Sequence, residues 1–268
     1  MIKAEIADLT PEGYPVITRK VWRLGESTAV KLKTGSTSYY LGGIENIHAT
    51  IIDSVPGVEF KEPGVSDEIF VYVLEGLILY EGGRCVRKDE AVFHCPNVPY
   101  QGKYAGTETI RALVLKVTPK LGSKPPDPAL MRNVIRLADI KPVKLPFGTG
   151  TERYSFIKTE NLHVSMGVNW PVMEFMDPGH WDPELVFGIE GKLEYFDGRD
   201  VRPGDLITNG YNVPHPGRYA TGKAVRILEC STSLYRVGAG FQPDGVPLPG
   251  YINAWKNQTL KQLLSKKK

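Results

Sequence analysis

One segment of this 268-residue chain occurs twice. Residues 34–113 align with residues 149–228 at a constant shift of 115, without a gap, and 28 of the 80 aligned pairs are identical. Unrelated segments of average composition would share roughly 5 identities over that length. A unit of about 95 to 115 residues has the size of a domain and is too long for a solenoid repeat. The repeat therefore predicts two domains of one fold, and the differences between the copies indicate which copy carries chemistry.

Each copy consists of short runs rich in Val, Ile, Tyr and Phe, separated by Gly, Pro, Asn and Asp. Such runs occupy residues 68–74, 77–80, 91–93 and 225–228. A spacing of about 8 to 12 residues with turn signals between the runs is typical of an all-β sandwich or barrel. Gly82-Gly83 and Asp197-Gly198 stand at matching places and predict two hairpin turns. Only residues 254–266 show a helical pattern, which predicts a short C-terminal helix.

The division into domains follows from the repeat and from a proline-rich segment between the copies. We expect an N-terminal domain over residues 1–118, a linker over residues 119–133 with the run Pro125-Pro126-Asp127-Pro128, and a C-terminal domain over residues 134–268.

Composition narrows the classes of function. The net charge of +3 argues against nucleic acid as a partner, because such proteins carry a basic stripe. The three cysteines form no CxxC pair, which favours a reducing compartment. We find neither a signal peptide nor a run of about 18 apolar residues. We therefore expect a cytoplasmic protein with a small-molecule substrate and no membrane partner, and a homodimer because barrel edge strands often pair.

The C-terminal copy contains three residues that could hold a metal ion: His180, Glu184 and His215. Two imidazoles and one carboxylate on neighbouring strands of a small barrel could converge on one interior point. This donor set suits Fe, Mn, Ni, Co or Zn.

These stretches resemble the two sequence motifs of the cupin superfamily. His180, three residues, Glu184, six residues and Gly191 match the second half of the first motif, and Pro203-Gly204-Asp205 with His215 matches the second. The first His of the family's pattern falls on Pro178 in this chain. Because the repeat carries the pattern through both copies, the chain resembles a bicupin. The resemblance implies two tandem cupin (double-stranded β-helix, jelly-roll) barrels and one divalent metal ion, with Fe(II) or Mn(II) favoured over Zn, Ni or Co.

The N-terminal copy has lost all three candidate ligands. Val65, Ile69 and Tyr100 stand where the C-terminal copy has His180, Glu184 and His215. A buried carboxylate without a metal or another partner is unfavourable, so loss of the metal favours loss of every ligand. We therefore expect a single metal site, in the C-terminal barrel.

Five further residues of the C-terminal copy are candidates for the site. Glu174 could act as a general base, although Glu59 mirrors it in the other copy. His163 is mirrored by His48, which favours a structural hydrogen bond, with a role as fourth ligand as the alternative. The remaining three are weaker candidates for a substrate pocket: Asn209, Arg226 and Glu229.

Three functions remain open. A His–Glu–His site resembles that of non-haem Fe(II) oxygenases and favours an enzyme that oxidises a small oxygen-rich molecule. The first alternative is a non-redox isomerase, lyase or aminohydrolase. The layout is similar to ureidoglycine aminohydrolase-type bicupins, but their Glu, His, His, Gln order falls on Pro178, His180, Glu184 and His215. The second alternative is a non-catalytic, sugar-binding or storage-type bicupin.

Overall fold

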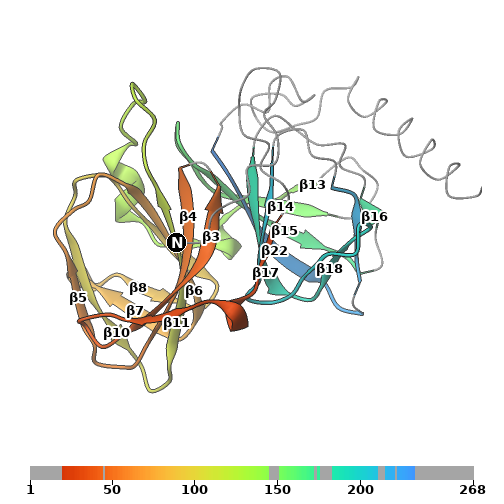
Figure 1. Cartoon of the computed structure of the whole chain (residues 1–268). Helices are drawn as coiled ribbons and strands as arrows, with labels where there is room; N and C mark the ends of the chain where they lie inside the picture. The colour runs from red at the N-terminus through yellow and green to blue at the C-terminus, as the bar shows by residue number, and fades with distance from the viewer. Residues whose placement is uncertain are drawn as a thin grey trace, which may run out of the picture. The chain divides into compact units, whose positions relative to one another are not determined.

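The computed structural model describes residues 20–44, 46–144, 151–171, 174–175, 183–210, 215–220 and 222–232. These residues form strands, turns and four short 3-10 segments (Figure 1): η1 Leu24–Glu26, η2 Glu81–Gly83, η3 Pro128–Arg132 and η4 Leu137–Asp139. The all-β prediction is confirmed, whereas the helix expected at residues 254–266 lies outside the described residues. Within the described ranges no helix reaches the length and apolar character that crossing a bilayer requires.

The N-terminal repeat forms a seven-stranded and a four-stranded antiparallel sheet. The larger sheet has the order β12-β9-β6-β11-β4-β3-β2 and the smaller one the order β5-β10-β7-β8. The strands of the larger sheet are β2 Ala29–Lys31, β3 Thr37–Ile44, β4 Ile47–Ser54, β6 Glu68–Glu75, β9 Glu90–His94, β11 Ile110–Val117 and β12 Ile135–Arg136. Those of the smaller sheet are β5 Glu59–Glu62, β7 Leu77–Tyr80, β8 Cys85–Arg87 and β10 Tyr100–Ala105.

The two sheets of this N-terminal barrel face each other (Figure 1). An apolar core lies between them. Alternate residues of a strand point to the same face, so β6 contributes Ile69, Val71 and Val73 to this core. The facing sheet contributes Ile78 and Tyr80 from β7. The strands that the sequence predicts at residues 68–74 and 77–80 are thus the two walls of the barrel interior.

The C-terminal repeat has the same plan. A seven-stranded sheet has the order β1-β20-β17-β22-β15-β14-β13, and a four-stranded antiparallel sheet has the order β16-β21-β18-β19. The larger sheet contains β1 Lys20–Trp22, β13 Val143–Lys144, β14 Glu152–Lys158, β15 His163–Asn169, β17 Glu184–Glu190, β20 Leu206–Asn209 and β22 Val225–Ser231. The smaller sheet contains β16 Glu174–Phe175, β18 Leu193–Tyr195, β19 Asp200–Val201 and β21 Gly217–Tyr219.

Contacts divide the described residues into two compact units that do not follow chain order strictly. One unit contains residues 22–44, 46–142 and 154–166; the other contains residues 20–21, 143–144, 151–153 and the described residues from 167 to 232. Residues 20 and 21 therefore belong to the C-terminal unit. Here the backbone N–H of Lys20 donates to Oγ1 of Thr208, and Val21 packs against the C-terminal core.

The same turn precedes β9 in one barrel and β20 in the other, although its residues differ. The backbone N–H of Arg202 donates to the Asp205 carboxylate at 3.1 Å, and that of Arg87 donates to the Glu90 carboxylate at 2.9 Å. The third position has a positive φ in both turns, +87° at Gly204 and +67° at Asp89. The Pro203-Gly204-Asp205 motif is thus a tight turn that leads directly into β20.

In both barrels a phenylalanine ring packs against a strand at a glycine. A Cβ atom on Gly102 would lie 2.8 Å from the Phe60 ring, and one on Gly217 would lie 2.7 Å from the Phe175 ring. Each ring packs at van der Waals distance on the bare glycine backbone. This contact holds the short strands β5 and β16 against their sheets.

Candidate functional site

Three polar side chains meet inside the C-terminal barrel: Glu184, Asn209 and His215. Glu184 and His215 are each 4 % exposed, and Asn209 is fully buried. The Nδ2 amide of Asn209 donates to Oε1 of Glu184 at 2.8 Å, and Nε2 of His215 lies 3.1 Å from the same oxygen. Burying an ionisable pair costs desolvation free energy, which opposite charges or hydrogen bonds must offset.

The strands fix this arrangement through their register. Glu184 is the first residue of β17 and lies directly opposite Asn209, the last residue of β20. Two residues further along β17, Val186 faces Ile207 in the apolar core. Because alternate residues share a face, Glu184 and Asn209 stand at the end of the core and point into the barrel.

His215 approaches from the smaller sheet, two residues before β21. Its ring contacts Tyr195 edge-on, with ring centroids 6.4 Å apart. Tyr195 and Val186 belong to the apolar core, so the polar group lies at the edge of that core.

The donor set suits a divalent ion. Two ligands of one ion with bonds of about 2.0–2.2 Å lie about 3.0–3.4 Å apart, and the Glu184–His215 separation falls in this range. The amide of Asn209 orients the carboxylate, as residues behind metal ligands commonly do. Oδ1 of Asn209 is buried without a hydrogen-bond partner among the described residues. In the described part of the chain no group of three or more His, Cys, Asp or Glu side chains is placed to hold a metal ion, and His180 lies outside that part.

The N-terminal barrel fills the equivalent space with rings. Ile69 faces His94 in the register that Glu184 and Asn209 use in the other barrel. Tyr100 stacks on His94, with ring centroids 3.7 Å apart and planes 13° apart. Burial, and to a lesser extent the charge of Arg84, lowers the pKa of His94 to about 3. The imidazole is therefore neutral at pH 7, and the space lacks the carboxylate of its counterpart.

The structure separates two other candidates from this cluster. Glu174 is exposed on β16, where it alternates with Phe175, the residue that packs on the core. Arg226 alternates along β22 with the core residue Ile227, so the arginine lies on the opposite face of the sheet; its Nη1 is 4.0 Å from the Glu190 carboxylate. Neither side chain is directed toward Glu184.

His163 is half-buried and its Nε2 lies 3.2 Å from Oγ of Ser155. In the N-terminal copy, Nδ1 of His48 lies 3.2 Å from the Tyr40 hydroxyl. Both barrels thus give this repeated histidine a hydroxyl partner on the neighbouring strand, in line with a structural hydrogen bond.

Glu229 does face the barrel interior, and it forms an ion pair with Arg153. Sequence reasoning did not single out Arg153. The signal was available, because the repeat aligns Arg153 with Ser38 and Glu229 with Val114, so a charge appears at two interior positions of one copy.

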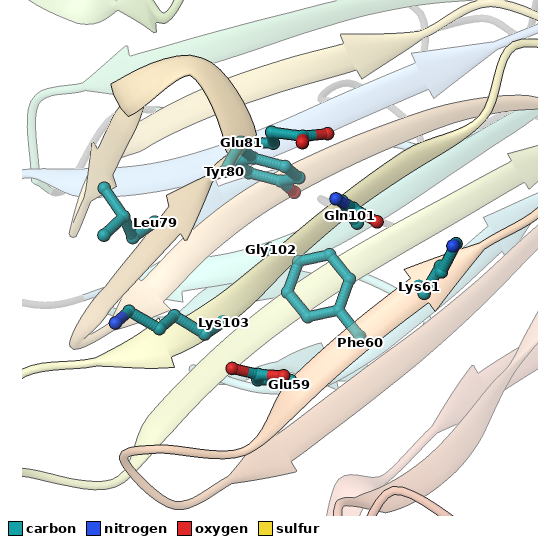
Figure 2. A pocket seen from close by; sticks show the side chains of 9 residues that line it. All are labelled: Glu59, Phe60, Lys61, Leu79, Tyr80, Glu81, Gln101, Gly102 and Lys103. Carbon is teal, nitrogen blue, oxygen red and sulfur yellow. The ribbon is translucent and has the colours of Figure 1, made fainter.

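Two surface grooves occur in the N-terminal unit. One of about 400 Å³ lies along β5, β7 and β10 (Figure 2), where the ends of Glu59, Lys61, Glu81 and Lys103 surround the Phe60 ring. Another of about 560 Å³ lies beside Asp89, Arg136 and Tyr154. Charges of both signs line the first groove, and neither groove contains the buried carboxylate–imidazole pairing seen in the C-terminal barrel.

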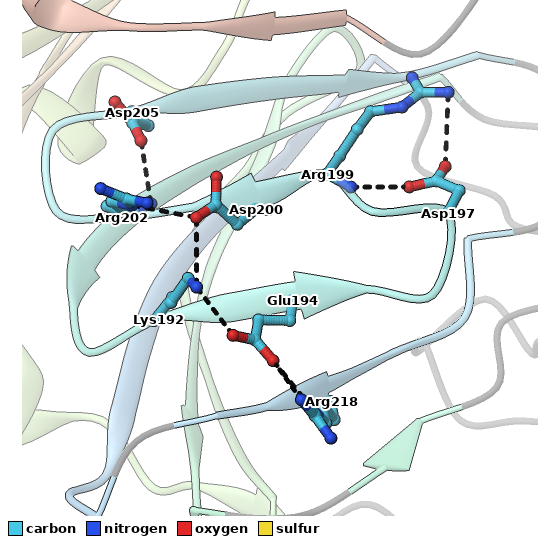
Figure 3. A network of polar contacts seen from close by, with 8 residues as sticks. All are labelled: Lys192, Glu194, Asp197, Arg199, Asp200, Arg202, Asp205 and Arg218. Carbon is cyan, nitrogen blue, oxygen red and sulfur yellow. Dashed lines mark hydrogen bonds and ion pairs between the residues drawn. The ribbon is translucent and has the colours of Figure 1, made fainter.

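The smaller sheet of the C-terminal barrel carries a surface network of ion pairs (Figure 3). Glu194 accepts from Arg218 at 2.8 Å and from Lys192 at 2.7 Å, and Lys192 also lies 3.3 Å from Asp200. The hydrogen bond from Lys192 and that from Arg218 lower the pKa of Glu194. Because these groups are solvent-exposed, the network contributes little to stability.

Known proteins resemble this chain in structure rather than in sequence. No protein-family model and no curated protein matches it. A Pseudomonas aeruginosa protein provisionally described as glyoxylate-induced is 17 % identical, with a TM-score of 0.70 over 88 % of this chain and 94 % of its own. A Nostoc punctiforme protein provisionally described as a dioxygenase is 10 % identical, with a TM-score of 0.67 over 83 % and 85 %. Oxalate decarboxylase from Lactobacillus farciminis, solved with formate, is 9 % identical, with a TM-score of 0.62 over 80 % and 86 %.

Proposed function

The chain has the bicupin fold, and on that premise we propose that it is a metal-dependent enzyme that oxidises a small oxygen-rich molecule. The reaction is of the non-haem dioxygenase type and takes place at one divalent ion in the C-terminal barrel. The observation that carries this proposal is the buried Glu184–His215 pair, 3.1 Å apart, at positions where the N-terminal barrel has Ile69 and Tyr100.

His180, Glu184 and His215 are the proposed ligands, and their imidazole and carboxylate donors favour Fe(II) or Mn(II). A bound ion of this kind supplies open coordination positions for substrate and O₂ and the capacity for electron transfer.

The surrounding residues prepare this position. The Nδ2 amide of Asn209 fixes the rotamer of the Glu184 carboxylate, which keeps it turned toward His215. Tyr195 and Val186 exclude water from the core side. Burial and, to a lesser extent, the nearby Glu184 carboxylate raise the pKa of Cys230, so this thiol is protonated at neutral pH.

The first test is metal content. Untagged protein should contain about one ion per chain, and the variant Glu184→Ile/His215→Tyr, which introduces the residues of the N-terminal barrel, should lose it. We expect at least a roughly hundredfold weaker affinity, because two of three ligands are removed. His180→Ala should also empty the site while the circular dichroism spectrum is kept. Tyr100→Phe, the matched change in the other barrel, should leave metal content unchanged.

The second test is oxygen uptake by iron-loaded protein with hydroxy acids, diketones and phenolic compounds as substrates. Oxygen uptake that disappears in Glu184→Ile/His215→Tyr supports the proposed dioxygenase-type oxidation. A loaded enzyme that consumes no oxygen would instead favour a non-redox isomerase, lyase or hydrolase, and wild-type protein without stoichiometric metal would refute the proposal.

A further inference from the structure

Strand β5 forms an edge of the smaller sheet in the N-terminal barrel. It is the end strand of that sheet, and in the described part of the chain it pairs with β10 alone. The backbone N–H of Tyr104 on β10 donates to the Val58 carbonyl, just before β5, at 2.9 Å. Because hydrogen bonding alternates along an antiparallel strand, Phe60 also bonds to β10, whereas the N–H and C=O groups of Glu59 and Lys61 point away from it. No backbone hydrogen bond among the described residues occupies that outer side.

Exposed charges without partners lie along this edge. Glu59 and Lys61 alternate with Phe60, which packs on the core, so both charged side chains point to the outer face of the sheet. Lys103 lies directly opposite Glu59 on β10. Four charged side chains surround the groove in Figure 2, and within the described ranges none of them has an ion pair or a hydrogen bond: Glu59, Lys61, Glu81 and Lys103.

The C-terminal barrel pairs the equivalent charge within its own sheet. Arg218 stands at the position of Lys103, and Glu194 stands at the position of Leu79. Arg218 donates to the facing Glu194 carboxylate at 2.8 Å. In the N-terminal barrel Lys103 faces Leu79, which cannot accept such a bond. The outer face of the N-terminal sheet therefore leaves its charges available to a partner outside the chain.

The order of charges along β5 is complementary to itself. When a second copy of β5 runs antiparallel with Phe60 opposite Phe60, Glu59 of each copy faces Lys61 of the other. The outward backbone groups belong to these same two residues, so each facing pair can exchange two hydrogen bonds. Opposite charges that face each other across antiparallel strands stabilise the pairing, whereas like charges destabilise it. A two-fold axis at Phe60 thus satisfies both the backbone and the charges.

We propose that the chain forms a homodimer in which β5 pairs with β5 of a second copy. The two smaller sheets then continue into each other across the two-fold axis, and each Glu59 carboxylate lies between Lys103 of its own chain and Lys61 of the other. A lysine on an edge strand often prevents association, but in this register it meets a carboxylate and selects one alignment. Because one short strand buries little surface, we expect a dissociation constant on the order of 10 µM.

Charge reversal tests the register, with sedimentation velocity on the full chain at low salt as the measurement. Lys61→Glu places glutamate opposite glutamate, and Glu59→Lys places lysine opposite lysine. Since like charges then meet at two places in the dimer, each variant should weaken association by roughly a hundredfold or more. The double variant Glu59→Lys/Lys61→Glu restores opposite charges and should dimerise like the wild type. An equimolar mixture of the two single variants should form heterodimers, although neither variant associates alone.

Lys88→Glu is the matched control, because it makes the same change of charge at an exposed lysine outside the groove and should leave the dimer intact. A wild-type chain that stays monomeric up to about 500 µM would overturn the inference, since even weak interfaces associate at that concentration. So would a dimer that Lys61→Glu does not weaken, or a double variant that keeps the wild-type circular dichroism spectrum but stays monomeric. The test does not depend on a metal, so its failure leaves the proposed function standing.

Discussion

Where the N-terminal barrel stacks Tyr100 on His94, the C-terminal barrel brings His215 to Glu184 and Asn209. The backbone frame is shared, since Ile69 faces His94 in the register in which Glu184 faces Asn209. The side chains differ as a set, because a buried carboxylate or imidazole is costly once its partners are gone. A duplicated barrel thus changes its interior by whole groups of residues while its strands and turns stay the same.

Exchanging single residues between the barrels tests how far they are equivalent. The largest effect is expected for Gly188→Val, which introduces the residue found at Val73. Val73 is fully buried in the N-terminal core, whereas a Cβ atom on Gly188 would lie 2.3 Å from the Arg202 carbonyl oxygen. Because that contact is with backbone, we expect a loss of about 3 kcal/mol in the free energy of unfolding, measured by urea denaturation.

Gly222→Val is the control for this change, since no atom lies within 4 Å of the Cβ position there. It should cost far less than Gly188→Val. Similar losses from both variants would show that the close approach of Arg202 does not distinguish the barrels.

A smaller effect on the free energy of unfolding, confined to acidic pH, is expected for His94→Asn. This change introduces the residue found at Asn209 of the C-terminal barrel. The pKa of His94 is about 3 in the folded protein and about 6.5 in an unfolded chain. Between these values only the unfolded state binds the proton, so the free energy of unfolding falls as the pH decreases from 6.5 toward 3. The contribution reaches at most about 1.4 kcal/mol per pH unit.

His94→Asn should therefore flatten the dependence of unfolding free energy on pH between about 6 and 4, whatever its effect at pH 7. Denaturation series at several pH values measure this slope. An unchanged slope would mean that His94 takes up its proton in the folded barrel.

The smallest effect is expected for Arg218→Lys, which introduces the residue found at Lys103. Both Nε and Nη2 of Arg218 contact Oε2 of Glu194, a geometry that lysine cannot reproduce. Since the arginine side chain is 54 % exposed, the change should cost only a few tenths of a kcal/mol and should vanish in high salt. A loss above about 1 kcal/mol would mark the surface network in Figure 3 as a structural difference between the barrels.

The strand pattern could be predicted from the sequence alone. Residues 77–80 form β7 as predicted, and Gly82, Gly83 and Gly198 all have the positive φ of tight turns. Cupin spacing singled out Glu184 and His215, which lie 31 positions apart in the chain and 3.1 Å apart in the barrel; their role as metal ligands stays a prediction.

Other residues could not be placed by pattern. The general-base prediction for Glu174 did not show which way its side chain faces: Phe175 takes the inward position, where its ring packs on Gly217, and Glu174 is exposed. The repeat marks Arg153 by its alignment with Ser38, but it does not show the contact of Arg153 with Glu229, which is 76 residues away in the chain. Tertiary packing decides both cases.

The pairing of β1 with the sheet of β20 has a consequence for biosynthesis. Lys20 pairs with Thr208 across 188 residues, so β1, the first strand of the described residues, must wait for most of the C-terminal barrel to be synthesised before it can pair. Until then the backbone groups of β1 stay unpaired, and a chain without β1 leaves the outer edge of β20 open to other chains. Truncation before residue 23 should accordingly raise the yield of inclusion bodies more than it lowers the activity of whatever protein stays in solution.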